Sequence, residues 1–135
     1  VFQEPPALRW RLFSFQQLGL MNVKVFKNQI RILRTLDSRM QMQTAETLLG
    51  AMDAAPCHMS SLGALVGTSQ ASISRNCAAL GKIHRKGMPG LGLIETVEDP
   101  FNRKRKIVYL TPKGEKYKQL LFDPEAAAKF LKKHR

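Results

Sequence analysis

Residues 59–75 read MSSLGALVGTSQASISR, and this stretch decides the fold. Ser60 is the expected N-cap of a first helix that ends at Gly67, because apolar residues recur between them at helical spacing: Leu62, Leu65 and Val66. Ser69 is the expected N-cap of a second helix. Residues 67–69 leave room only for a tight corner, and two helices joined by such a glycine-containing turn form a helix-turn-helix unit.

The second helix, predicted over residues 69–86, has two unlike faces. At about 100° per residue, one narrow stripe holds Ile73, Cys77, Leu80 and His84. The opposite face is small and basic: Ala71, Arg75, Ala78, Lys82, Arg85 and Lys86. A solvated helix face usually mixes charges, but here no acidic residue occurs between positions 69 and 94. Small side chains let a helix enter the major groove of DNA, about 12 Å wide. The predicted DNA contacts of this helix are Ser69, Gln70, Ala71, Ser72, Ser74, Arg75, Lys82, Arg85 and Lys86.

Two short strands follow, predicted at residues 93–98 and 107–110. Residues 99–102 supply turn chemistry between them, and four cations come next: Arg103, Lys104, Arg105 and Lys106. We expect a hairpin with a basic tip, a wing, whose arginines suit the narrow minor groove. The alternative is a solvated or localisation-signal-like basic run.

Further helices flank this core. Apolar residues at helical spacing predict a helix over 26–36, and Thr44 is the expected cap of a helix that ends before Pro56, with a short extended piece at 57–59. Thr111-Pro112 and Asp123-Pro124 are typical helix starts, for helices ending near residues 122 and 134. The apolar surplus of these last helices is explained either by a partner chain or by packing within the domain.

The predicted fold class is mostly α with a small β-hairpin (α+β), a winged helix-turn-helix with flanking N- and C-terminal helices. Residues 41–121 form the predicted DNA-binding core. Residues 1–40 and 122–135 are predicted to serve dimerisation. A helix starting near Pro6 is plausible, but the sequence leaves open whether residues 1–20 are native, processed or added.

Charge points to the class of partner. The chain carries 22 Lys and Arg against 10 Asp and Glu, a net charge of +12. Residues 61–135 hold most of that excess. Such a chain attracts polyanions, chiefly nucleic acid, because each neutralised phosphate releases counterions.

Several function classes are not expected. No apolar run approaches the ~18 residues of a membrane span, and no secretion signal is present, so a cytoplasmic, nucleoid-associated protein is expected. Nucleotide-binding, hydrolase and metalloprotease motifs are absent, and the histidines show no metal-ligand spacing. We therefore expect no enzyme, metal or cofactor. Cys77 and His84 are interpreted as packed residues rather than reactive ones.

Two stretches resemble the MarR family of bacterial transcription regulators. Residues 59–75 are similar to that family's M-S-x-L-A-x-x-L-G-x-S-x-x-x-V-[ST]-R pattern, matched at Met59, Ser60, Leu62, Gly67, Ser69, Ile73, Ser74 and Arg75. Residues 92–121 resemble its wing, G-L-[VI]…D-P-x-D-x-R…[LV]-x-L-T-x-x-G, matched at Gly92, Leu93, Ile94, Asp99, Pro100, Arg103, Val108, Leu110, Thr111 and Gly114. The two stretches and the span between them cover close to half of the chain.

The resemblance implies a homodimer on a palindromic site, with Arg75 in the major groove and Arg103 at the minor groove. Asn102 stands where the family has an acid, and residues 82–92 form a longer link, so a displaced wing or an extended helix is expected. Small-molecule effectors of the family do not transfer by fold alone.

Three functions remain open at this point. The first is a dimeric, sequence-specific regulator of transcription, most simply a repressor. The second is a winged-helix accessory factor of phage or plasmid replication, partition or transcription that binds DNA and recruits a protein partner. The third is a protein-interaction module whose basic face binds an acidic partner.

Overall fold

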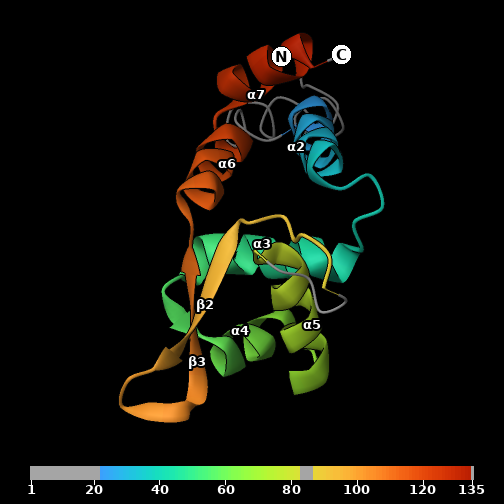
Figure 1. Ribbon diagram of the computed structural model, residues 1–135. Helices are drawn as coiled ribbons and strands as arrows, with labels where there is room; N and C mark the ends of the chain where they lie inside the picture. Colours follow the sequence, from blue (N-terminus) through green and yellow to red (C-terminus); the bar gives the residue numbers. More distant parts are fainter. Residues whose placement is uncertain (1–21, 83–86, 135) are drawn as a thin grey trace, which may run out of the picture.

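The computed structural model describes residues 22–82 and 87–134 of the 135-residue chain. The segment before residue 22, including the helix considered from Pro6, lies outside the described residues. The elements are α2 Val23–Leu36, α3 Met42–Ala54, β1 Cys57–His58, α4 Met59–Val66, α5 Gln70–Leu80, β2 Ile94–Asp99, β3 Asn102–Leu110, α6 Pro112–Phe122 and α7 Pro124–Lys133. The predicted fold class, a mostly helical winged helix-turn-helix with flanking helices, is confirmed (Figure 1).

The described helices gather in two groups (Figure 1). The helices α2, α6 and α7 contact one another at one end of the molecule, while α3, α4 and α5 pack together with the sheet at the other. The helix α6 leaves β3 and rises toward α7. No helix in the part of the chain described here is both long and apolar enough to cross a bilayer.

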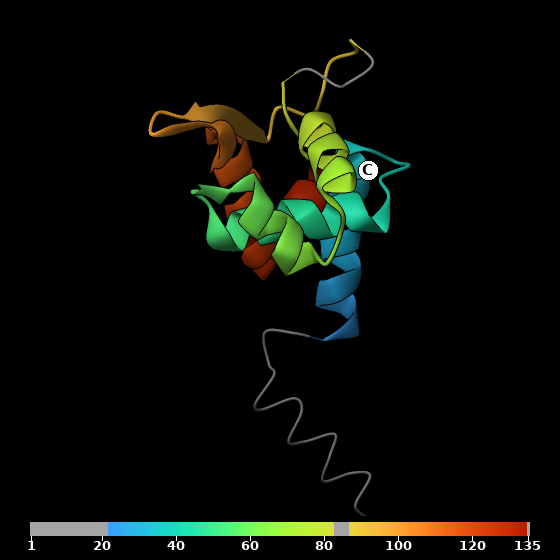
Figure 2. The same ribbon diagram turned by 90° about the horizontal axis from the view of Figure 1, so that it is seen from below.

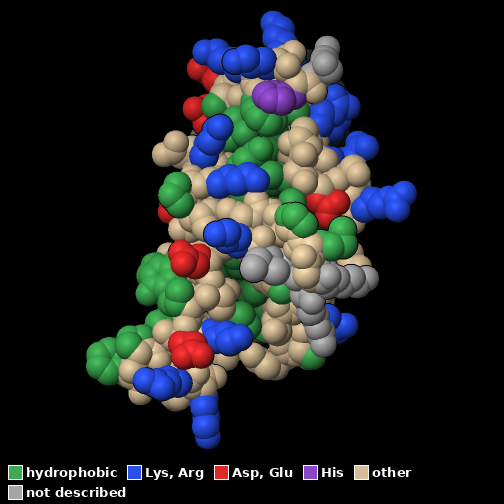
Figure 3. Space-filling model, in the orientation of Figure 1, with side chains coloured by type: hydrophobic (Ala, Val, Ile, Leu, Met, Phe, Trp, Pro, Cys, Tyr) green, Lys and Arg blue, Asp and Glu red, His purple; other side chains and the backbone are tan. Residues whose placement is uncertain are grey.

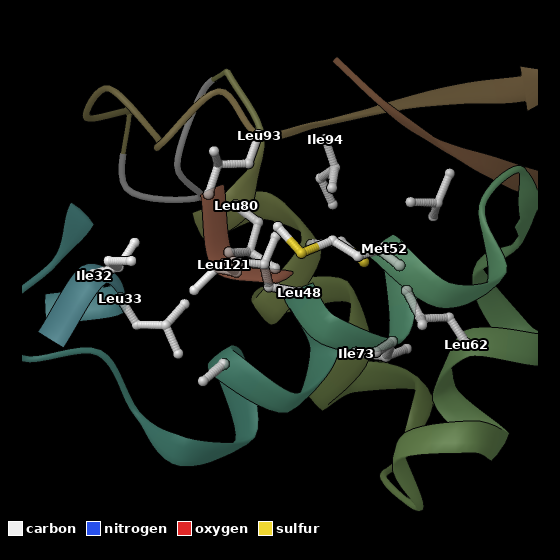
Figure 4. Close-up of a cluster of buried hydrophobic side chains, with 14 of the residues drawn as sticks. Ile32, Leu33, Leu48, Met52, Leu62, Ile73, Leu80, Leu93, Ile94 and Leu121 are labelled. Carbon is white, nitrogen blue, oxygen red and sulfur yellow. The ribbon is translucent and has the colours of Figure 1, made fainter. Parts of the chain in front are cut away.

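One continuous apolar core runs through both groups of helices, and it includes Ile32 of α2 and Leu121 of α6 (Figure 4). Leu48 of α3, Leu62 of α4 and Ile73 of α5 are all fully buried within it. The stripe predicted for the second helix is confirmed for Ile73, Cys77 and Leu80, which are all buried. His84, the fourth predicted member, lies outside the described residues.

The sheet has three antiparallel strands in the order β1-β3-β2. Ile94 pairs with Leu110 and Thr96 with Val108, so the buried Ile94 and Val108 lie on the face that packs on the core. The extended piece predicted near residue 57 becomes a third strand, because Cys57 pairs with Val108.

Most of the predicted helix ends are confirmed, but two caps are wrong. Gly67 ends α4 in the left-handed conformation, at φ 74°, and Ser69 accepts a hydrogen bond from the Ser72 N–H. Thr44, by contrast, is buried inside α3, whose N-cap is Gln41. Ser60 lies in the first turn of α4, whose N-cap is His58. The helix α3 therefore begins three residues earlier than predicted, and α4 begins two residues earlier.

The predicted extension of the second helix to residue 86 is wrong over Gly81 and Lys82. The helix α5 ends at Leu80, and Gly81 is extended. The returning chain supplies the reason, since residues 90–93 donate their N–H groups to the last carbonyls of α5 and the two that follow. The bonds are Leu91 N to Ala79 O (3.1 Å), Leu93 N to Leu80 O (2.8 Å), Gly92 N to Gly81 O (2.9 Å) and Gly90 N to Lys82 O (3.0 Å). Because these carbonyls already accept hydrogen bonds, no further helical turn is needed to satisfy them.

Gly90 makes this closure sterically feasible, which gives a first prediction. A β-carbon at position 90 would overlap the Gly81 carbonyl group and lie 3.2 Å from Ala78 O. We expect Gly90→Ala to lower the free energy of unfolding by about 1–3 kcal/mol, as overpacking does. Met88→Ala is the matched control, because Met88 is an exposed residue of the same loop and should change stability by less than about 0.5 kcal/mol. Urea unfolding of both variants measures the difference, and equal midpoints would contradict this account of the closure.

Candidate nucleic-acid interface

The N-terminal half of α5 presents a polar surface with one cation. Ser69 caps the helix, its hydroxyl donates to Ser72 Oγ at 3.1 Å, and Arg75 Nη2 donates to the same Ser72 oxygen at 3.4 Å. These hydrogen bonds join residues three positions apart on one helix face, and they hold the Arg75 guanidinium toward the N-terminus of the helix. Four of the predicted contacts here are exposed, namely Gln70, Ala71, Ser74 and Arg75, as is the cap Ser69, while Ser72 is half-buried.

The opposite side of α5 is fixed by a polar cluster that the sequence pattern did not reveal. Asn76 is buried, and its Oδ1 accepts a hydrogen bond from Thr44 Oγ1 at 3.1 Å. Its amide nitrogen donates to Gln43 Oε1 at 3.1 Å and Thr47 Oγ1 at 3.4 Å. All three partners lie on α3. The only signal in the sequence was an asparagine beside the apolar stripe, with polar residues at helical spacing in α3.

The remaining predicted contacts of the second helix do not join this surface. Lys82 is exposed, but it lies beyond the end of α5 and therefore outside its helical face. Arg85 and Lys86 lie outside the described residues. The described basic face of α5 is thus shorter than predicted and holds Arg75 as its one cation.

The four wing cations are in a strand rather than at a tip, which corrects the prediction. The turn consists of Pro100 and Phe101, because Asp99 pairs directly with Asn102. The strand β3 begins at Asn102 and contains all four exposed cations: Arg103, Lys104, Arg105 and Lys106. Strand alternation puts the two arginines on one face and the two lysines on the other. Cations therefore lie on both faces of β3 behind an uncharged turn, while β2 beside it carries Glu95, Glu98 and Asp99.

One carboxylate ties the hairpin turn to the body of the protein. Asp99 Oδ1 accepts a hydrogen bond from the Phe101 N–H at 2.9 Å, and its Oδ2 lies 2.9 Å from His58 Nε2. His58 is both the last residue of β1 and the N-cap of α4. These bonds to His58 and then to Phe101 hold the pKa of Asp99 below its ordinary value. Sequence reasoning identified Asp99 as part of the turn but missed His58 as its partner.

A hollow of about 520 Å³ separates the C-terminal half of α5 from β2, with Cys77, Ala78, Lys82, Glu95 and Thr96 among its lining residues. Burial, and then the neighbouring Cys57, raises the pKa of the Cys77 thiol to about 11. Burial also raises the pKa of Cys57. Both thiols therefore stay protonated near neutral pH, the form that is poorly nucleophilic.

The helix α5 and the hairpin lie at the same end of the molecule, away from α7 (Figures 1 and 2). In the view from below, the two elements lie side by side across this end. Lys and Arg side chains spread over the molecular face of Figure 3, down to the hairpin, and are interspersed with fewer Asp and Glu side chains. A polar helix face and a cation-lined hairpin are therefore available to one polyanionic surface.

Several solved structures share this arrangement of helices and hairpin. A crystal structure of MarR matches with a TM-score of 0.55 and 22% identity, over 93% of this chain and 74% of that one. The RV1404 protein from Mycobacterium tuberculosis matches with a TM-score of 0.59 and 15% identity, over 98% and 81% of the two chains. Overoxidized AbfR bound to DNA matches with a TM-score of 0.57 and 15% identity, over 91% and 77%.

The molecule has the MarR-like winged-helix fold. The resemblance in residues 59–75 and 92–121 is thus confirmed at the level of structure, over most of the chain and at low identity. No model of a protein family matches the sequence, and no curated protein matches it.

The Asp99 anchor of this MarR-like wing gives a second prediction. Because its pKa is lowered in the folded state, Asp99 stabilises the fold fully above the ordinary aspartate pKa of about 4, and this stability is lost as pH falls through the lower folded pKa. We expect Asp99→Asn to be less stable than the wild type at pH 6. The gap should narrow on acidification below about pH 4.

Urea unfolding at pH 6, 4 and 3 measures this difference. Glu98→Gln is the matched control, because it neutralises the adjacent carboxylate, which is exposed and for which no side-chain hydrogen bond is found within residues 22–82 and 87–134. A constant gap between Asp99→Asn and wild type at all three pH values would contradict the role of Asp99.

Proposed function

We propose that this MarR-like protein is a sequence-specific, double-stranded DNA-binding regulator of transcription, most simply a repressor, acting in the cytoplasm on the nucleoid. One observation carries the proposal. The exposed face of α5, which is free of acids and carries Arg75, lies at the same end of the molecule as a hairpin with four exposed cations in β3. In winged helix-turn-helix geometry, such a helix enters the major groove and such a hairpin reaches the adjacent minor groove.

The helix α5 and the hairpin would make different kinds of contact with DNA. On α5, the guanidinium of the exposed Arg75 would bind a guanine edge, while Gln70, Ser72 and Ser74 would offer shorter donors and acceptors to bases and phosphates. The hairpin cations would contact phosphates and the minor groove, which supplies affinity with little base specificity. Support also comes from the fold of AbfR, which was crystallised bound to DNA.

A homodimer is part of the proposal and rests on the α2, α6 and α7 group. Phe26 of α2 and Phe122 of α6 are more than half exposed. An open groove of about 760 Å³ runs between α6 and α7, with Leu120, Phe122 and Phe130 in its lining. Apolar surface of this kind is typical of subunit interfaces, and a second copy would present a palindromic pair of α5 helices.

The Arg75 contact gives a third prediction. The Arg75→Ala change should weaken binding to the selected site by about 1–3 kcal/mol, roughly 5- to 150-fold, and leave random duplexes nearly unaffected, because a bidentate base contact discriminates between sequences. Fluorescence anisotropy with a duplex selected from genomic fragments and with a random duplex measures both affinities.

A wing variant is the control for Arg75. The Lys104→Ala change should weaken both duplexes equally and reduce the slope of log affinity against log salt concentration by about one, as loss of a phosphate contact does. If wild-type protein binds selected and random duplexes equally well at physiological salt, specific recognition is wrong. If it binds neither duplex at low salt, the protein is instead an interaction module for an acidic partner.

The dimer gives a fourth prediction. Multi-angle light scattering at micromolar concentration should return twice the 15.2 kDa of one chain. Phe122→Glu should shift that mass toward the monomer, because it replaces an exposed apolar ring in the lining of the groove with a charge. Glu125→Lys is a control, since it changes the charge of an exposed residue in the first turn of α7 and should leave the mass unchanged. A monomeric wild type would contradict the dimer.

A second candidate function, the accessory factor that recruits a protein, is favoured by the outer face of the hairpin. Val97 and Tyr109 are partly exposed there, on strands that also carry the cations. A pulldown that recovers a replication protein or a polymerase, without any effect on promoters, would favour this candidate over the regulator.

A further inference from the structure

The turn of the hairpin carries the most exposed large apolar side chain among residues 22–82 and 87–134. Phe101 is 97% exposed, and Pro100 before it is exposed as well. An aromatic ring in water at the outermost point of a protein contributes nothing to the core. Its position, at the turn between β2 and β3, makes it the leading point of the hairpin (Figure 1).

The turn holds this ring in a defined place. Proline fixes its own φ, and the Phe101 N–H is bonded to Asp99 Oδ1. On the other side of the ring, the Lys104 N–H donates to Asn102 Oδ1 at 3.2 Å. Asp99 is itself held by His58, so the position of the turn is tied to β1 and α4 rather than left to a free loop. A side chain on such a turn keeps less conformational freedom to lose on binding.

The charges around the ring indicate what it meets. The first residue of β3 after the turn is Asn102, and the next four are cations, which alternate between the two faces of the hairpin. A polyanion would be drawn to both faces of β3, next to the uncharged ring. Between the two phosphate rows of a DNA groove lie the base-pair edges, and the apolar faces of the bases become accessible where a step is opened.

We propose that Phe101, backed by Pro100, is an apolar wedge that enters the minor groove, opens one base-pair step and kinks the duplex. The inference rests on the proposed DNA-binding function and adds to it a contact and a DNA deformation. Minor-groove proteins insert phenylalanine or proline side chains between base steps and bend the duplex in this way. Flexible pyrimidine–purine steps are the expected targets, because they are the easiest to unstack.

A protein partner for Phe101 is less well supported. An apolar docking patch needs neighbouring apolar surface, yet the ring is followed by four cations. The partly exposed Val97 and Tyr109 are separated from the turn along their strands by Glu98 and Asp99 and by the basic segment of β3. Cations around a lone aromatic side chain match the charge of nucleic acid rather than that of an ordinary protein surface.

The test uses a selected duplex with 2-aminopurine scanned through its steps, and an end-labelled copy of the same duplex for bending by energy transfer. Wild-type protein should raise 2-aminopurine fluorescence at one step per half-site and shorten the end-to-end distance. Phe101→Ala should abolish both signals and weaken binding by about tenfold, within the range measured for loss of one aromatic–base stack. Phe101→Leu, which keeps an apolar wedge, should retain part of the bend.

Met88→Ala is the matched control, because Met88 is an exposed apolar loop residue outside the hairpin. It should leave both signals unchanged. Thermal unfolding midpoints should be equal for wild type and Phe101→Ala, since the ring makes no core contact. A wild type that binds the selected duplex without unstacking or bending it would overturn the wedge and leave the proposed function standing.

Two other outcomes are equally clear. A wild type that binds no duplex overturns the proposed function and the wedge with it. If Phe101→Ala leaves DNA binding and bending intact but abolishes capture of a protein partner, the ring is a protein contact and the wedge is overturned.

Discussion

The buried amide of Asn76 fixes the rotation of α5 about its own axis. An unsatisfied buried amide costs about 1–3 kcal/mol, so α5 is stable only where that amide reaches Thr44, Thr47 and Gln43 together. Apolar packing alone would tolerate a helix rotated by several degrees, because it has no direction. The amide cluster does have a direction. It therefore decides which residues of α5 face outward, and the serine-bonded Arg75 is among them.

The C-terminal end of α5 fixes the position at which the hairpin begins. Hydrogen bonds from residues 90–93 to the carbonyls of residues 79–82 end the helix and set where β2 begins. The hairpin is then tied a second time, at its turn, through Asp99 and His58. These contacts fix the position of the hairpin relative to α5. If they persist on binding, the duplex must adjust to the spacing between α5 and the hairpin.

The helices and strands could be predicted from the sequence because the residues that mark their ends act on nearby atoms. Gly67, Ser69 and Thr111 are confirmed at helix ends because a left-handed turn or a hydroxyl cap depends on a few neighbouring atoms. The misassigned residues depend on distant partners. Thr44 resembles a helix cap in the sequence, but in the structure its hydroxyl donates to Asn76, which is 32 residues away. The helical pattern of α5 continues past Leu80 in the sequence, but the helix ends there because residues 90–93 donate to the carbonyls of residues 79–82. The sequence predicts that the cations of residues 103–106 belong to the hairpin, which is confirmed, but the two-residue turn places them in β3 rather than at the tip.

That shift changes what the hairpin can do. A basic tip would enter the narrow minor groove through its negative potential and would not need to open a base step. In this protein the leading point is a ring, and cations stand behind it on both faces of β3. Attraction to the two phosphate rows would then pull the ring toward the floor of the groove between them. In the proposed wedge, the phosphate contacts of these cations would help to offset the energy needed to open a base step.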